Sequence, residues 1–217
     1  GGFQGKIYMT APTFSLVEVI LNDAAKIAQE KVGYVPLYGI DEVEKTLSMV
    51  EIVEYEKDIK LDPFVLRFKD AGHILGSASI EVIDQDDKKK IVFSGDLGNT
   101  PEDIISPTTY IDDADIVVME STYGDVVHPT EDPSQIIMEE INAIEENPGV
   151  LLIPAFSLER TQEILHRIHH LKKDGKIRQD TPVFMDSPMG IRATEIFKQF
   201  REFYNEEMQT HSDDPFG

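Results

Sequence analysis

Hydrophobic positions recur at helical spacing near the start of the chain. An apolar residue every three or four positions predicts a helix over 13–30, and a shorter helix is predicted over 41–50. Ser15 and Glu18 match a capping box at the start of the first helix. The apolar stripe of that helix consists of Leu16, Val19, Ile20, Ala24 and Ile27.

Three segments rich in β-branched and aromatic residues follow these helices. They cover 64–68, 78–83 and 91–93, and each predicts a strand. The polar run 84–90 between the last two predicts a hairpin turn.

Strand and helix patterns alternate in the rest of the chain. Strands are predicted at 115–119, 150–153 and 182–185, the first of them buried, and helices at 133–146, 158–172 and 189–204. This alternation predicts a parallel sheet covered on both faces, and hence an α/β fold. Gly, Pro and Asp cluster over 125–133, so we expect two domains, 1–126 and 127–217.

Composition narrows the chemistry. The chain has no cysteine, which excludes disulfides and thiolate metal sites and suits a cytoplasmic protein. No apolar run is long enough to cross a bilayer, so no membrane partner is expected. A net charge of −21 repels a phosphate backbone, although it also serves solubility. Nucleic-acid binding would therefore need local positive charge, such as metal ions in a cleft.

Two loops that contain glycine carry the first candidate chemistry. His73 lies between two glycines just before a predicted strand, and Asp96 follows the next strand of the hairpin. Either residue alone would be interpreted as part of a turn. A hairpin returns the chain to its starting end, so both side chains should lie at one end of the sheet. A converging imidazole and carboxylate are suitable ligands for zinc.

A third candidate is Glu120, which follows the predicted strand 115–119. Ligand-handling residues gather at the carboxyl ends of parallel strands. A single glutamate there is also explained as a capping or surface carboxylate. His128 lies shortly after it.

Three motifs occur in one order along the chain: Asp-Ala-Gly-His-Ile-Leu-Gly-Ser-Ala at 70–78, Phe-Ser-Gly-Asp-Leu-Gly at 93–98 and Glu-Ser-Thr-Tyr-Gly-Asp at 120–125. Together they resemble the β-CASP branch of the metallo-β-lactamase superfamily, as do 6–13, 153–162 and 185–189. The resemblance implies that 1–126 is part of an αββα sandwich. It implies that 127–217 is part of a β-CASP α/β domain with a mainly parallel sheet.

The resemblance also implies roles for the candidate residues. His73 and Asp96 would be metal ligands, with Asp96 bridging two zinc ions. The catalytic set would be Asp96, Glu120 and His128, with Glu120 working beside a histidine from a later segment. Arg160 and Ser187 would border a nucleic-acid channel, although a helix-face ion pair explains Arg160 equally well.

The chain departs from the family pattern in its histidines. The His-x-His-x-Asp-His motif, which supplies most of the metal ligands, does not occur, nor do the later histidine motifs. His166, His169 and His170 share one predicted helix and are interpreted as a solvated face. We therefore expect the chain to be a middle portion of a longer protein and inactive by itself.

The expected function of the intact protein is zinc-dependent hydrolysis of RNA phosphodiester bonds. The sequence Glu-Ser-Thr-Tyr-Gly favours RNA over DNA, because it resembles the mRNA 3′-end-processing endonuclease and its prokaryotic relatives. Two alternatives remain: a non-catalytic β-CASP paralogue that scaffolds an RNA-processing complex, and a small-molecule metallo-hydrolase. A homodimer is compatible with the sequence.

These interpretations make one spatial prediction. If a metal site is preformed, the His73 ring and the Asp96 carboxylate should approach within about 5 Å. The strand before Glu120 should run parallel to the strand before Asp96, so that all three residues share one edge. Opposite ends of the sheet, or a side chain sealed in the core, would contradict the metal-site interpretation.

Overall fold

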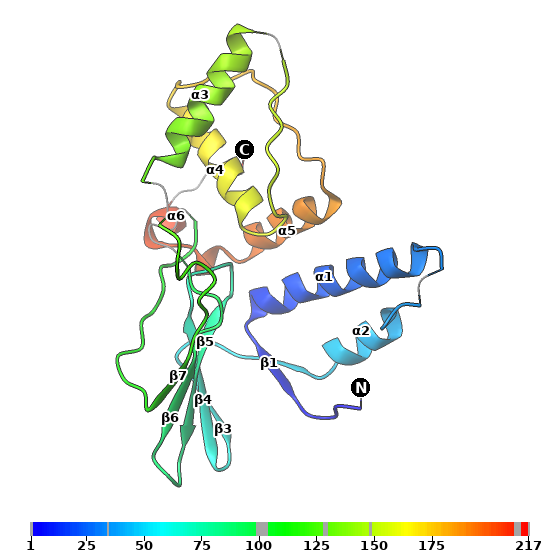
Figure 1. Cartoon of the computed structure of the whole chain (residues 1–217), viewed down its shortest axis with the longest axis vertical. Helices are drawn as coiled ribbons and strands as arrows, with labels where there is room; N and C mark the ends of the chain where they lie inside the picture. Colours follow the sequence, from blue (N-terminus) through cyan, green and yellow to red (C-terminus); the bar gives the residue numbers. More distant parts are fainter. Residues whose placement is uncertain are drawn as a thin grey trace.

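The computed structural model describes residues 2–33, 35–98, 104–127, 130–147, 149–210 and 214–216. Two helices and two sheets form the first part of the chain, and helices gather beyond one end of the larger sheet in the second part (Figure 1). The mixture of helices and sheets confirms the α/β class.

The chain begins with two parallel strands connected by two helices. These elements are β1 (Ile7–Met9), α1 (Ala11–Glu30), α2 (Ile40–Leu47) and β2 (Val50–Ile52). Thr10 caps α1, since its side chain accepts a hydrogen bond from the backbone N–H of Thr13. The predicted capping box of Ser15 and Glu18 is therefore wrong. The helix begins earlier, because the Thr10 hydroxyl is already available there as a cap.

A five-stranded sheet carries the loops of the predicted site. Its strands, in spatial order, are β3 (Asp58–Leu61), β4 (Phe64–Asp70), β5 (Ala78–Asp84), β6 (Lys90–Phe93) and β7 (Ile116–Val118). Neighbours are antiparallel from β3 to β6, whereas β7 runs parallel to β6. The β4–β5 connection and the carboxyl ends of β6 and β7 therefore lie at the same end of the strands, which we call the site edge of the sheet. This confirms the predicted hairpin and the predicted parallel strand.

Strand β7 lies at the end of this sheet. Its side chains are about half exposed, at 53% for Ile116, 57% for Val117 and 50% for Val118. The prediction of a buried strand is therefore wrong about burial, although the strand itself is confirmed. An apolar run predicts burial only if something covers both faces and, in the described part of the chain, β7 has a strand on one side alone.

The second part of the chain is helical. Its elements are α3 (Pro133–Glu146), α4 (Arg160–Lys173), α5 (Pro188–Gln199), the 3₁₀ turn η1 (Arg201–Phe203) and α6 (Glu206–Thr210). The sequence pattern predicts α3, α4 and α5, although the predicted helix 189–204 ends at Gln199. It misses β1, β2, β3 and α6, which are all short. Among the helices that the structure describes, none is long and apolar enough to cross a membrane.

The predicted strands 150–153 and 182–185 are absent. Both segments are described, and neither forms a strand. Val150, Leu152 and Phe184 are more than four-fifths exposed. A strand needs a neighbour for its ladder hydrogen bonds, and neither segment has one in the described residues. The predicted parallel sheet of the second part is therefore not formed by these residues.

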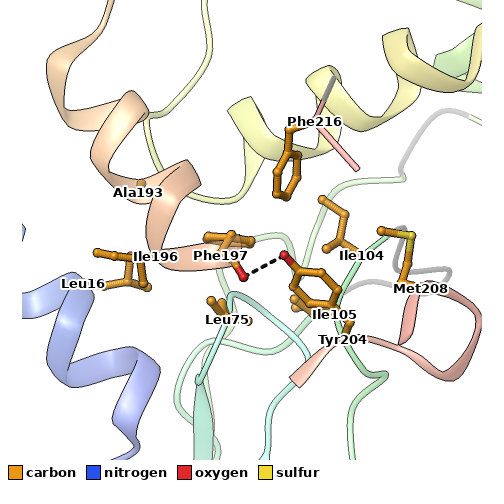
Figure 2. Packing of buried hydrophobic residues seen from close by; sticks show 10 residues of the cluster. All are labelled: Leu16, Leu75, Ile104, Ile105, Ala193, Ile196, Phe197, Tyr204, Met208 and Phe216. Carbon is orange, nitrogen blue, oxygen red and sulfur yellow. Dashed lines mark hydrogen bonds between the residues drawn. The ribbon is translucent and has the colours of Figure 1, made fainter. Parts of the chain in front are cut away.

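One hydrophobic cluster joins the two parts of the chain. Tyr204 and Phe197 lie at its centre, and the Tyr204 hydroxyl donates to the Phe197 carbonyl over 2.7 Å (Figure 2). An antiparallel bridge from Ile105 to Tyr204 adds a backbone link. The cluster consists of Leu16, Leu75, Ile104, Ile105, Ala193, Ile196, Phe197, Tyr204, Met208 and Phe216. The predicted division after residue 126 stays a prediction, and this cluster contains residues from both sides of it.

The histidines of α4 do not form a solvated face as predicted. His166 is only 7% exposed, and its Nδ1 lies 3.3 Å from the carbonyl oxygen of Pro215. The His170 ring lies against it, with 4.4 Å between ring centroids. Helical spacing alone does not show that the segment 214–216 folds back over this face. Burial, followed by the neighbouring charge of His170, lowers the pKa of His166 to about 4.

The buried His166 predicts a pH dependence of stability. In the unfolded chain this imidazole takes up a proton near pH 6.5, whereas in the folded protein it does so only near pH 4. The folded protein keeps this imidazole neutral, and the stability that this contributes is fully present above pH 6.5. It is lost as the pH falls towards 4. The free energy of unfolding should fall by up to about 2 kcal/mol between pH 7 and pH 5 through this group.

Urea unfolding of the wild type and of His166→Phe across this interval checks the prediction. The phenylalanine keeps an aromatic ring but cannot titrate, so the variant should lose less stability on acidification. Equal pH dependence in the two proteins would contradict it.

Candidate functional site

The loop that carries His73 connects β4 to β5 and is held by its own side chains. The Ser77 Oγ accepts hydrogen bonds from the backbone N–H groups of His73 and Ile74, over 3.1 and 3.2 Å. The Ser77 N–H in turn donates to the Ile74 carbonyl. These bonds fix the backbone on both sides of the imidazole.

Hydrogen bonds also connect the same loop to the start of α1 and to the segment before β3. The carbonyl of Gly76 accepts from the hydroxyls of Thr10 and Thr13, over 2.7 and 2.8 Å. Tyr55 donates its hydroxyl to the Ser77 carbonyl over 2.7 Å, and burial raises the pKa of this phenol. The start of α1 and the segment before β3 therefore both position the loop.

The loop that carries Asp96 follows β6 and touches the His73 loop backbone to backbone. The N–H of Gly98 donates to the Ala71 carbonyl over 2.9 Å. A Cβ atom at Gly98 would lie only 1.5 Å from the carbonyl oxygen of Gly72. The two loops can approach this closely because position 98 has no side chain.

His73 and Asp96 face one another across this contact. The distance between His73 Nε2 and Asp96 Oδ2 is 3.9 Å, and their side chains are 41% and 74% exposed. The predicted approach is confirmed, and neither side chain is sealed in the core. Ligands that share a zinc ion each lie about 2 Å from it, so these atoms can reach one ion between them.

Glu120 joins the pair at the same edge. Its Oε1 accepts from the backbone N–H of Leu97 over 2.7 Å, and its own N–H donates to Ser94 Oγ over 3.1 Å. Hydrogen bonds from Thr122 and then from the Leu97 N–H lower the pKa of Glu120, and nearby His73 contributes less. Glu120 is therefore ionised near neutral pH and links the end of β7 to the Asp96 loop.

These residues fit part of a metal site. An exposed imidazole and an exposed carboxylate match the ligands that zinc prefers. A complete site needs about four donors per ion. In the described residues, no group of three or more His, Asp or Glu could hold a metal. His73 and Asp96 thus fit as two ligands of a larger set, and the bridging of two ions by Asp96 stays a prediction.

The other predicted site residues lie on the second part of the chain. Arg160 forms an ion pair with Glu163, one turn along α4, over 2.8 Å, which is the alternative that the sequence left open. Ser187 caps α5, since its Oγ accepts from the Gly190 N–H over 3.0 Å. Roles of Arg160 and Ser187 in nucleic-acid binding stay predictions. His128 lies outside the described residues.

Sequence reasoning missed the residues that hold these loops. Ser77 and Ser94 are hydroxyls placed next to glycines, a turn signal that could have pointed to them. Glu159 gave no such signal, yet its Oε2 accepts from the backbone N–H of Leu75 over 3.1 Å. That contact joins residues 84 positions apart, and local patterns do not reveal it.

Comparisons with known proteins find one matching domain and several similar ribonucleases. Residues 161–217 match the Beta-Casp domain. A ribonuclease of Thermus thermophilus is 34% identical over 97% of this chain and 47% of its own length. An RNase of Saccharolobus solfataricus is 33% identical over 94% of this chain and 40% of its own length. An RNase J-like protein of Methanocaldococcus jannaschii is 30% identical, with shares of 98% and 50%. The chain thus spans half or less of the length of these relatives.

The contact between the two loops predicts that substitution of Gly98 destabilises the protein. Gly98→Ala would place a methyl group against the Gly72 carbonyl, so the loops must separate. We expect a loss of about 1–3 kcal/mol in the free energy of unfolding, measured by denaturant titration. Gly149→Ala is the control, because its Cβ would lie at 3.6 Å from the nearest atom, an ordinary contact. Equal stability of the two variants would contradict the close approach.

Proposed function

We propose that the intact protein is a metal-dependent ribonuclease. Residues 161–217 match the Beta-Casp domain, and nearly the whole chain is similar to proteins named as ribonucleases. One observation in the structure supports this most directly. His73 and Asp96 converge to 3.9 Å on an exposed edge, although they lie on separate loops. RNA is the expected substrate, and hydrolysis of its phosphodiester bonds the expected reaction.

His73 and Asp96 would hold the metal. Their contribution is one imidazole nitrogen and a carboxylate with two oxygens, and further ligands would come from other parts of the intact protein. Bound zinc ions would supply the Lewis acidity that activates water and offsets the charge of the phosphate. The Ser77 Oγ accepts hydrogen bonds from two backbone N–H groups beside the imidazole, which would keep His73 in position to hold the metal.

Glu120 would position neighbouring groups and would not itself transfer a proton. A carboxylate whose pKa is lowered is a weak base, and its oxygen already accepts the Leu97 N–H. It can fix the Asp96 loop and offer its other oxygen to a neighbouring donor. This supports the interpretation that Glu120 orients a histidine from a later segment.

The charge of the site supports a need for cations. Asp96 and Glu120 place two carboxylates beside His73, in a chain of net charge −21. A phosphate group approaching this edge would be repelled unless positive charge is present. Metal ions at His73 and Asp96 would provide that charge where the phosphate binds.

Asp96→Asn tests the role of the carboxylate. The change keeps the size of the side chain and removes its charge, so kcat for RNA cleavage by the intact zinc-loaded protein should fall at least about 100-fold. Zinc content and melting temperature should be measured in parallel. Asp86→Asn is the control, since Asp86 lies in the β5–β6 turn at the opposite end of the same sheet. Normal turnover by Asp96→Asn would refute the ligand role. Lack of cleavage by the wild type would favour the non-catalytic scaffold.

The chain taken alone should be nearly inactive. It presents two credible metal ligands in its described residues, and partial sites bind metal weakly. RNA turnover by the purified 217-residue chain with zinc should be no higher than that of its own Asp96→Asn variant. Robust turnover abolished by that substitution would show that other residues of this chain complete the site.

A further inference from the structure

One hydrogen bond to the His73 loop comes from the start of α4, in the second part of the chain. Four other backbone N–H groups of this loop donate to acceptors within the loop, either on Ser77 or on Ile74. These donors belong to Ala71, His73, Ile74 and Ser77. The N–H of Leu75 donates instead to Glu159, over 3.1 Å. Leu75 is 1% exposed and lies in the hydrophobic cluster shown in Figure 2. Loss of the acceptor would leave a buried donor unpaired, which is costly.

Glu159 adopts a backbone conformation that its residue type disfavours. Its φ and ψ are 58° and −64°, and the N–H of Arg160 donates to the Leu158 carbonyl over 2.8 Å. This is a γ-turn with positive φ, a rare and strained form. For a side chain other than glycine, such strain is of the order of 1–3 kcal/mol. Glycine would suit the turn better if backbone geometry were the only requirement.

The side chain of Glu159 is also used in an unusual way. Glu159 is the N-cap residue of α4, yet its side chain makes no capping hydrogen bond to that helix. It is 8% exposed, and its Oε2 reaches the Leu75 N–H in another part of the fold. A buried carboxylate is retained only where hydrogen bonds offset the loss of hydration. Burial, strain and the long-range bond all point to a specific task for this carboxylate.

We propose that Glu159 is a positioning residue that holds the His73 loop in its metal-binding conformation from the start of α4. It acts through its hydrogen bond to the backbone N–H of Leu75, two residues after His73. The proposal rests on the proposed ribonuclease function of the same edge. It implies that the helix that begins the Beta-Casp match at residue 161 also sets the geometry of the sheet edge.

A purely structural role is the competing explanation, and two substitutions separate the two. Glu159→Gly removes the acceptor but relieves the strained turn, so stability losses and gains offset each other. Glu159→Gln keeps the turn and retains an oxygen that can accept the Leu75 N–H. If Glu159 serves only the fold, the two variants should rank by stability alone, and activity should follow that rank.

The experiment uses the intact zinc-loaded protein with RNA as substrate. For Glu159→Gly we expect exchange of the Leu75 amide, followed by hydrogen-exchange mass spectrometry, to accelerate at least about 10-fold. Its kcat should fall by about 10-fold or more with KM changed little, at a melting temperature close to wild type. Glu159→Gln should restore slow exchange and most of kcat.

The remaining outcomes distinguish a failure of the positioning role from a failure of the proposed ribonuclease function. Wild-type exchange at Leu75 in Glu159→Gly would show that the bond holds nothing. Faster exchange with unchanged kcat would make Glu159 a structural residue only. If the wild type cleaves no RNA, the ribonuclease function fails, and zinc affinity then decides the positioning role. Affinity about 10-fold weaker in Glu159→Gly than in Glu159→Gln supports that role, and equal affinity overturns it.

Discussion

The close approach of two glycine-containing loops is the constraint on which the candidate site depends. Gly98 passes so near the Gly72 carbonyl that a single methyl group would not fit, and a hydrogen bond to Ala71 fixes the contact. His73 and Asp96 each lie within two residues of this point. Their separation is therefore set by backbone packing rather than by attraction between the side chains. Such a site can be preformed without a bound ion, because flexible side chains need not find one another.

Sequence reasoning located this edge because the relevant information is local. The hairpin between β5 and β6 fixes which ends of the strands meet, and the apolar run before Glu120 gave the parallel strand β7. Turn chemistry and strand patterns are sufficient for that. The pattern failed where contacts from distant residues decide the outcome. The helical pattern predicts a solvent-exposed His166, because helical spacing does not show that Pro215 lies against it. Segments 150–153 and 182–185 have strand-like composition, but strands also need partners.

Glu159 illustrates the same limit at the site itself. A glutamate at a helix start is normally interpreted as a surface charge that is favourable near the helix N-terminus. Its actual partner, Leu75, lies 84 positions earlier, and the hydrophobic cluster around Tyr204 and Phe197 brings the two together. That cluster connects α1, the His73 loop and α5 in one packed unit (Figure 2). The position of the candidate site therefore depends on the fold of the second part of the chain, although its own residues all come from the first.

The exposed strand β7 has a consequence for how copies of this chain behave towards one another. Its three apolar residues and Met119 are all at least half exposed, and the described residues leave one side of the strand without a ladder partner. Edges of this kind recruit strands from other molecules and start aggregation. The charge of −21 opposes such encounters at long range, because every copy repels every other. Salt screens this repulsion within about 10 Å at 0.1 M, so dilute buffer is the condition that protects the open edge. The net negative charge of the chain thereby opposes the pairing of β7 with a strand of another copy.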